Sequence, residues 1–233
     1  MSPRRFYKDV SVNSAGELHR VLLDGKPVKT PGGAILALPS YALAHAIADE
    51  WRAQEATIKP QTMLLTKLAN TAIDRVAPNP ASAREQLLAF AKSDVVSYRA
   101  ESPADLVQQQ ALTWDPLLSW ALQRFGASLR IASGLSFVDQ DEAAIRALAD
   151  ALEGHDAFAL AGLYSAATLL GSLVIALALF ESKVSPEDAF AAANLEKIYQ
   201  AERWGWDPHE TAKADAERAE LNQISRFLDL LRK

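Results

Sequence analysis

The stretch from residue 34 to residue 51 reads AILALPSYALAHAIADEW, and within it the chain changes from a strand pattern to a helix pattern. Ala34 to Leu38 is a short apolar run that follows a Pro-Gly-Gly turn, as is typical of a strand. From Ser40 onward, apolar side chains recur on one helical stripe that ends at Trp51. Ser40 is suited to cap the first turn of this helix. We therefore expect the β-rich part of the chain to give way to a helical part here.

The residues before this stretch predict three or four short antiparallel strands. Side chains over residues 6–12 alternate with the period of two that a half-buried strand requires. Asp24-Gly25 tolerates the positive φ angles of a tight turn, so it predicts a hairpin between the runs 20–23 and 26–29. Pro27 lacks a backbone N–H and therefore indicates an edge strand.

Alanine usage separates the two parts of the chain, with 3 alanines in residues 1–39 and 40 in the remaining 194. Apolar spacing predicts later helices over residues 64–76, 83–92, 115–125, 145–152, from Ser185 toward Trp204, and over 221–231. The fold class is therefore expected to be α+β. We predict a small antiparallel β-rich N-terminal domain with its first helix over residues 1–60, and a larger all-helical domain over residues 61–233.

Residues 157–180 carry no charge and are long enough to span a bilayer. Ser165, Thr168 and Ser172 recur at near-helical spacing, and no Lys/Arg cluster flanks the segment, which argues against a membrane span. We expect one buried central helix and no integral membrane segment. Gly162, Ala166 and Gly171 would allow neighbouring helices to approach closely.

Composition and motif searches exclude several kinds of chemistry. The chain has no cysteine, so disulfides, thiolate metal sites and cysteine nucleophiles are ruled out. The net charge is −5 without a dense basic stripe, so no nucleic acid is expected as a partner. No phosphate-binding glycine loop occurs and the four histidines are scattered, so we predict no cofactor, no metal site and no catalytic residue. The acidic pairs at 49–50 and 141–142 are interpreted as solvated helix faces.

Glu202 stands out on the expected helix that ends at Trp204. It follows Leu195, Ile198 and Tyr199 at helical spacing, so a carboxylate lies in line with an apolar stripe. Such a carboxylate is either paired inside the protein or used as a contact for a basic residue of a partner. Trp51 has the same two interpretations, a core anchor for the first helix or a partner contact.

Several blocks of the sequence resemble one family in order and spacing. These are RFYK at 5–8, LLDGKPVKTP at 22–31, LALP at 36–39, IADEWRAQ at 47–54, TAIDRV at 71–76, DVVSYRA at 94–100, QALTWDPLL at 110–118 and QAERWG at 200–205. Together they resemble the assembly chaperones for the α-subunit of ATP synthase.

The resemblance implies a β-rich domain followed by a helical domain, and a protein that is not an enzyme. Its expected function is that of an ATP-independent chaperone, which binds the unassembled ATP synthase α-subunit, masks its subunit-interface surface and promotes assembly of the catalytic hexamer. We expect a monomer that meets the α-subunit through Gln200, Glu202, Arg203, Trp204 and Trp51.

The chain begins almost directly at the first of these blocks, so a bacterial cytoplasm is expected, or the mitochondrial matrix for a trimmed eukaryotic form. The alternative function is that of a small-molecule, hydrolase-like enzyme with acidic residues at the domain junction.

Overall fold

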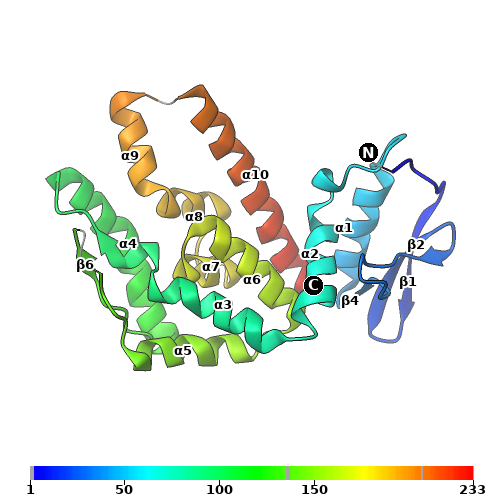
Figure 1. The fold of residues 1–233 in the computed structure, drawn as a ribbon, viewed down its shortest axis with the longest axis horizontal. Helices are drawn as coiled ribbons and strands as arrows, with labels where there is room; N and C mark the ends of the chain where they lie inside the picture. Colours follow the sequence, from blue (N-terminus) through cyan, green and yellow to red (C-terminus); the bar gives the residue numbers. More distant parts are fainter. Residues whose placement is uncertain (1–2, 135–136, 206, 233) are drawn as a thin grey trace. The chain divides into compact units, whose positions relative to one another are not determined.

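The computed structural model describes residues 3–134, 137–205 and 207–232 (Figure 1). Within them the chain divides into two compact units. Unit 1 comprises the residues up to Pro80, His155–Gly162 and the segment from Gln223 onward; unit 2 comprises Ala81–Gly154 and Leu163–Asn222. A small antiparallel strand region precedes the helices, so the predicted α+β class is confirmed. The domain boundary expected after residue 60 stays a prediction.

The sheet of unit 1 contains β1 (Val10–Ala15), β2 (Leu18–Leu23), β3 (Lys26–Pro27) and β4 (Ala37–Leu38). β2 pairs antiparallel with β1, β3 and β4. Asp24 and Gly25 form the predicted hairpin turn with φ angles of 48° and 76°. β3 lies at the end of the β1-β2-β3 order, as Pro27 predicts.

The strand expected over residues 6–12 begins later than predicted, at Val10. The chain before it bonds to the end of the first helix and its following loop instead of joining the sheet. The hydroxyl of Tyr7 donates to the carbonyl of Trp51 at 2.7 Å, and the N–H of Arg5 donates to the carbonyl of Ala56 at 3.0 Å. These bonds hold the segment against α1 and the loop that follows it. The alternating pattern over residues 6–9 therefore does not form a strand.

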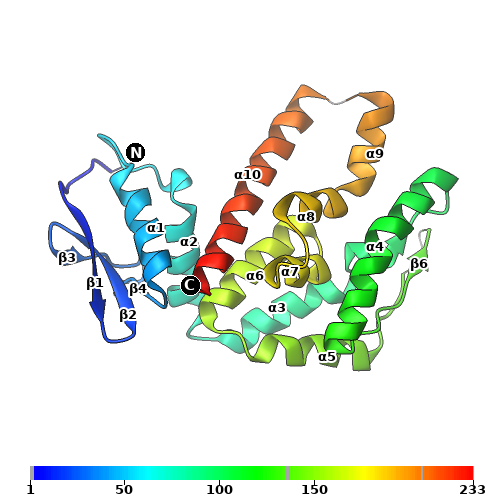
Figure 2. The same ribbon diagram turned by 180° about the vertical axis from the view of Figure 1, so that it is seen from behind.

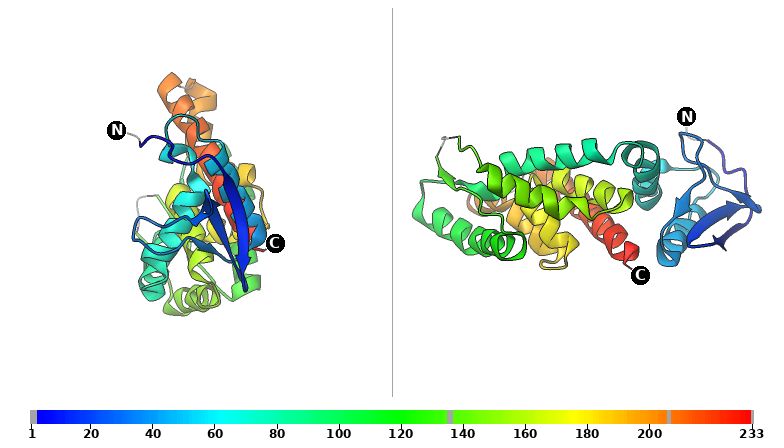
Figure 3. Two further views of the ribbon diagram at one scale, coloured as in Figure 1. Left: turned by 90° about the vertical axis from the view of Figure 1, so that its right-hand side faces the viewer. Right: turned by 90° about the horizontal axis from the view of Figure 1, so that it is seen from below.

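The first helix, α1 (Tyr41–Arg52), packs against β1 and β2 (Figure 3). Ser40 caps it as predicted, because its Oγ accepts the N–H of Leu43 at 3.1 Å. Leu43 and Ile47 on the inner face of the helix have no exposed surface. The core of unit 1 therefore forms where the apolar stripe of the helix meets the sheet.

The next elements are η1 (Pro60–Thr62), α2 (Leu64–Thr71) and a π-helical turn η2 (Ala72–Val76). Met63 precedes α2 and cannot cap it, so Glu50 supplies the cap from α1. Its carboxylate accepts the N–H groups of Leu65 and Thr66, both at 2.8 Å, and the hydroxyl of Thr66 at 2.7 Å. Burial raises the pKa of Glu50 despite these bonds. The prediction of a solvated face at 49–50 is therefore wrong for Glu50, whereas Asp49 is exposed and pairs with Arg52.

Residues 157–180 form two helices, so the prediction of one central helix is wrong. α6 (Ala157–Leu170) ends at Gly171, which has a φ of 63°, and α7 (Leu173–Phe180) starts afresh after Ser172. The Oγ of Ser172 accepts the N–H of Ile175 at 2.9 Å and caps the new helix. The close approach predicted at Gly171 is wrong, because no atom lies within 4 Å of where its Cβ would be. Gly171 ends α6 instead, because glycine adopts this positive φ without strain. No helix in the described ranges is both long and apolar enough to cross a membrane.

Gly162 does allow the close approach that was predicted for it. Within unit 1, α6 crosses the end of α10 (Pro208–Leu231) at this residue. A Cβ built on Gly162 would lie 2.4 Å from Cδ2 of Leu228 and 3.3 Å from Cδ1 of Phe227. Both neighbouring side chains are fully buried, so they have little room to move.

Unit 2 contains most of the helices and two short strands. Its elements in order are α3 (Pro80–Lys92), η3 (Val95–Ser97), β5 (Tyr98–Arg99), α4 (Ala104–Phe125), β6 (Ala132–Ser133), α5 (Glu142–Glu153), α6 from Leu163 onward, α7, α8 (Pro186–Ala193), α9 (Leu195–Trp204) and α10 up to Asn222. α4 begins well before the predicted residue 115, because the helix continues through Pro116. The carbonyl that loses its donor there belongs to Leu112, whose side chain is 70% exposed, so water can solvate that face.

The helix expected from Ser185 to Trp204 is also divided. Ser185 starts α8 as predicted, since its Oγ accepts the N–H of Asp188 at 3.1 Å. α8 then ends at Asn194, whose side-chain amide donates to the carbonyl of Phe190 at 3.1 Å. This local bond satisfies the end of one helix, and α9 starts at the next residue.

Asp94 joins two segments of unit 2 from a fully buried position. Its carboxylate accepts the N–H of Val96 in η3 at 3.3 Å and the N–H of Val174 in α7 at 3.0 Å. Burial raises the pKa of Asp94 from 3.8 to about 6, although these bonds oppose the shift. The first turn of α7 therefore depends on a carboxylate 80 residues away along the chain.

Replacing Gly162 with alanine is expected to lower the free energy of unfolding by about 1–3 kcal/mol, because the added methyl overlaps Leu228. Gly154→Ala is the matched control. Gly154 has a φ of −75° and open space around its Cβ position, so this change should raise stability by about 0.4–1 kcal/mol. Urea unfolding of both variants measures the difference, and equal midpoints would show that the helices can separate at no cost.

Asp94 should lower the free energy of unfolding as the pH rises, because burial raises its pKa. Because its folded pKa is about 6 and its ordinary value is 3.8, the folded state binds the proton more tightly than the unfolded state. Its contribution to the free energy of unfolding, about 3 kcal/mol, is therefore complete below about pH 4 and is lost as the pH rises through 6. In chemical unfolding from pH 4 to pH 7, the stability of the wild type minus that of Asp94→Asn should fall by this amount. Parallel pH profiles would contradict it.

Candidate functional site

Four of the five residues expected to bind a partner lie together on α9 in unit 2 (Figure 2). Gln200, Glu202, Arg203 and Trp204 occupy its last turns, and all four are exposed. Trp51 lies in unit 1, near the end of α1. The site on α9 is therefore built from unit 2 alone.

Gln110 of α4 fixes the start of α9. The side chain has no exposed surface, and both ends of its amide are bonded. Its Oε1 accepts the N–H of Ala100 at 2.8 Å, and its Nε2 donates to the carboxylate of Glu196 at 2.7 Å. One buried amide thus ties α9 to α4 and to the chain that follows β5.

Trp114, one helical turn further along α4, holds the end of α8. Its side chain is 1% exposed, and its indole N–H donates to the carbonyl of Ala192 at 2.8 Å. This carbonyl lies near the C-terminal end of α8, where carbonyls lack partners within the helix. The guanidinium of Arg99 covers the ring at 5.1 Å and forms an ion pair with Asp115 at 2.8 Å. The junction of α8 and α9 is therefore held from one side by α4.

Asp105, in the first turn of α4, holds the outer part of α9. The hydroxyl of Tyr199 donates to its carboxylate at 2.9 Å, and the guanidinium of Arg203 forms an ion pair with it. The bond from Tyr199 lowers the pKa of Asp105, while burial and then this same bond raise the pKa of Tyr199. Arg203 also lies over the ring of Tyr199 at 4.3 Å. Its charge is therefore engaged within unit 2.

Glu202 and Trp204 present the exposed groups of this helix end. Leu195 and Tyr199 are buried, but the stripe that they begin reaches the surface before Glu202. The carboxylate of Glu202 forms no hydrogen bond or ion pair with the residues that the structure describes. Trp204 is 78% exposed where α9 ends. The end of the helix thus displays a large apolar ring and, on a different side, a carboxylate without a partner in the described part of the chain. The role of these residues in partner binding stays a prediction.

Trp51 combines features of both interpretations given to it. Its ring packs edge-on against Tyr7 with centroids 5.7 Å apart, and Tyr7 is 4% exposed. The indole itself is only half buried, and it lines a cavity in unit 1. The structure therefore gives Trp51 a packing partner and leaves part of its surface accessible.

Gln110, like Glu202, is a polar residue in line with an apolar helical stripe, and the sequence predictions did not include it. Gln110 follows Leu106 and precedes Trp114 at intervals of four, which places an amide in the apolar stripe of α4. This pattern could have identified Gln110 as a structural residue. No comparable signal joins Asp105 to Arg203, because residues 98 positions apart meet only through the packing of α4 on α9.

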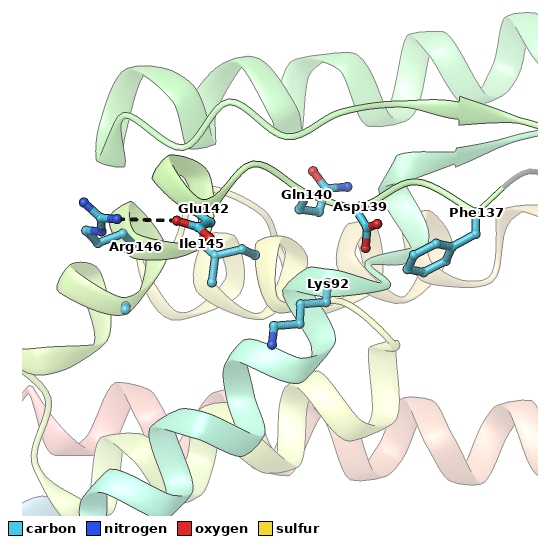
Figure 4. Close-up of a pocket in the computed structure, with 8 residues that line it drawn as sticks. Lys92, Phe137, Asp139, Gln140, Glu142, Ile145 and Arg146 are labelled. Carbon is cyan, nitrogen blue, oxygen red and sulfur yellow. Dashed lines mark ion pairs between the residues drawn. The ribbon is translucent and has the colours of Figure 1, made fainter.

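One cavity of unit 2 has a lining of balanced charge. One of about 460 Å³ lies between α3, the chain before α5, and α5 itself (Figure 4). Lys92 and Arg146 line it together with Asp139 and Glu142, so its charges balance. Neither carboxyl group with a raised pKa, Glu50 or Asp94, lies among its lining residues. Within the described part of the chain, no three His, Asp or Glu residues are grouped so as to hold a metal ion.

A rigid helical frame with an exposed aromatic and acidic helix end has the features of a protein-binding module. Comparison with known families agrees, since the model described as "ATP12 chaperone protein" matches residues 4–122. The chain belongs to this ATP12 chaperone family, and the family resemblance seen in the sequence is confirmed.

Related proteins cover almost the whole chain. Crystal structures of Atp12 from Paracoccus denitrificans and of an aspartate-to-lysine mutant are 38% identical, with a TM-score of 0.93 over 98% of both chains. The Atu1473 protein of Agrobacterium tumefaciens is 39% identical, with a TM-score of 0.93 over 98% of this chain and 86% of its own. The mitochondrial protein atp12 of Schizosaccharomyces pombe is 26% identical over 227 residues, which are 91% of this chain and 78% of that protein.

Replacing Gln110 with leucine should lower the free energy of unfolding by about 1–3 kcal/mol, because the N–H of Ala100 and the carboxylate of Glu196 lose their partner. Gln109→Leu, at the exposed neighbouring position, should change it by less than about 0.5 kcal/mol. Guanidinium unfolding of the two variants gives the comparison. Equal losses would show that the buried amide does not hold α9.

Proposed function

We propose that this protein is an ATP-independent assembly chaperone for ATP synthase, which binds the unassembled α-subunit, masks its subunit-interface surface and promotes assembly of the catalytic hexamer. Membership of the ATP12 chaperone family supports the chaperone role. It also disfavours the hydrolase-like alternative, so the proposed role is not enzymatic.

The observation that carries the proposal is the end of α9. A tryptophan that is 78% exposed costs solvation free energy in the isolated protein, and burial against a partner would recover it. Tryptophans at such positions often dominate the energy of protein interfaces. Glu202, on the same helix end and without a partner in the described part of the chain, would meet a basic group of the α-subunit.

The remaining predicted contacts take different parts in this proposal. Gln200 is exposed one turn before Trp204 and can donate or accept hydrogen bonds at the rim. Arg203 would act by orienting the helix end, because its guanidinium is bonded to Asp105 of α4. Since Gln110 and Asp105 hold α9 before any partner arrives, little conformational entropy would be lost when the surface is covered.

Release of the α-subunit requires no ATP in this scheme. An unassembled subunit exposes apolar surface that promotes aggregation, and a chaperone that covers this surface is displaced when the proper neighbouring subunit binds more tightly. We propose that a monomer performs this role, in a bacterial cytoplasm or a mitochondrial matrix. Relatives from Paracoccus denitrificans and from the mitochondria of Schizosaccharomyces pombe support these two locations.

A stoichiometric amount of the protein is expected to suppress the light scattering of isolated ATP synthase α-subunit. Glu202→Lys and Trp204→Ala should require at least about tenfold more protein for the same suppression, since each removes a central interface contact. Both side chains are exposed, so circular dichroism should show folded variants with unchanged melting.

Glu220→Lys supplies the control for this experiment. It makes the same charge change at an exposed position of α10, so it should suppress scattering like the wild type. Equal activity of all four proteins would place the binding site elsewhere, and no suppression by the wild type would reject the proposed function.

A further inference from the structure

The strand β1 leaves one side of its backbone without a neighbouring strand. It pairs with β2, and no other strand of the described chain joins it, so β1 is an edge of the sheet in unit 1. The edge of a sheet carries N–H and C=O groups that can bond to another extended chain. The contacts assigned above to α9 give this edge no role.

The pairing register identifies the residues of β1 that face outward. The N–H of Asp24 donates to the carbonyl of Asp9 at 3.0 Å, so these two residues form a hydrogen-bonded pair. In an antiparallel ladder, such pairs alternate with pairs whose backbone groups point away from each other. The register of β1 on β2 places Val10, Val12 and Ser14 in pairs of the second kind. Their N–H and C=O groups therefore point away from β2.

A separate contact agrees with this assignment. The guanidinium of Arg52, at the end of α1, donates to the carbonyl of Val10 at 3.0 Å, so this carbonyl does face away from β2. The backbone groups of Val12 and Ser14 on the same side have no such partner among the described residues. Arg52 therefore covers one end of the edge, and the other end is open.

The open end of the edge lacks the usual protection against strand pairing. Natural proteins protect such edges with charged side chains, proline or a bulge. The sequence of β1 is VSVNSA, without charge or proline, and its register with β2 is continuous over all six residues. Asn13 and Ser14 are exposed, and Val12 is half-buried. No charge within β1 would therefore repel an approaching chain.

We propose that the open edge of β1 binds an extended segment of the unassembled α-subunit as an added strand, through the backbone groups of Val12 and Ser14. A line of backbone donors and acceptors is matched by the backbone of an extended chain, so the hydrogen-bond pattern selects this kind of occupant. The inference rests on the proposed function, which gives the protein an unassembled client. Such proteins expose unpaired strand edges as well as apolar surface, and both promote aggregation.

Proline substitution tests the backbone bonds directly. Val12→Pro removes an outward N–H and places a ring where the added strand would lie, and proline is tolerated there because no bond to β2 is lost. Val12→Thr is the matched control, because it keeps both the N–H and the β-branched shape. In the scattering assay with the α-subunit, at least about tenfold more Val12→Pro should be required, whereas Val12→Thr should act like the wild type.

Ser14→Pro is the second variant, for the case that circular dichroism shows Val12→Pro to be unfolded. It also removes an outward N–H, at an exposed position, and should lose suppression to a similar extent. Full suppression by a folded proline variant would overturn the proposal.

Hydrogen exchange measures the same bonds without a substitution. With the α-subunit in excess, the amide groups of Val12 and Ser14 should exchange at least about tenfold more slowly than in the free protein. The amides of Ser11 and Asn13 are internal controls, because the register bonds them to β2 and they should already exchange slowly. Unchanged exchange at Val12 and Ser14 would also overturn the proposal.

The scattering assay separates this proposal from the proposed function. If the wild type and a folded Val12→Pro suppress scattering equally, the edge pairing is wrong and the chaperone function stands. If the wild type does not suppress scattering, both are rejected.

A second copy of this chain is the other candidate for the edge, and sedimentation of the protein alone distinguishes it. The wild type and Val12→Pro should both sediment as monomers. A wild-type dimer that Val12→Pro abolishes would overturn the assignment of the edge to the α-subunit.

Discussion

The placement of α9 depends on one buried amide. Gln110 has no access to water, so each hydrogen-bonding group of its side chain must find a partner inside the protein. Its two bonds, to the N–H of Ala100 and to Glu196, can form together only when α4, the chain after β5 and α9 meet in a single arrangement. Trp114 and Asp105 extend this fixed arrangement along both helices. The end of α9 is therefore held against α4 by bonds from Asp105, which favours recognition of a defined partner surface.

Buried carboxylates perform a related role at two helix starts. Met63 cannot cap α2, so Glu50 reaches it from α1, and Asp94 accepts an N–H in the first turn of α7. In both cases burial raises the pKa of the carboxyl group while N–H groups stabilise its charged form. These long-range caps hold segments together that are far apart in the sequence, because a helix end buried without partners would be unstable.

Two exposed groups mark the end of α9, the ring of Trp204 and the carboxylate of Glu202, which lacks a partner in the described chain. Residues two positions apart on a helix do not face each other, so the two groups point to different sides of α9. Glu202 favours a basic group of a partner, and Trp204 favours an apolar surface.

The sequence by itself determined the class of fold, the hairpin at Asp24-Gly25, the caps at Ser40 and Ser185 and the close approach at Gly162, because these follow from local periodicity and backbone preference. Its motifs also determined the chaperone family. Only tertiary structure decided that Gly171 and Asn194 divide predicted helices, that α4 continues through Pro116, and that Arg203 is bonded while Glu202 is left without a partner among the described residues. Arg203 is bonded to Asp105, 98 positions away, and the helix that starts after Gly171 uses Asp94, 80 positions before Val174, and local patterns carry no record of such partners. The division at Asn194 uses a local bond to Phe190, and Pro116 is tolerated because Leu112 lies on an exposed face, which periodicity does not report.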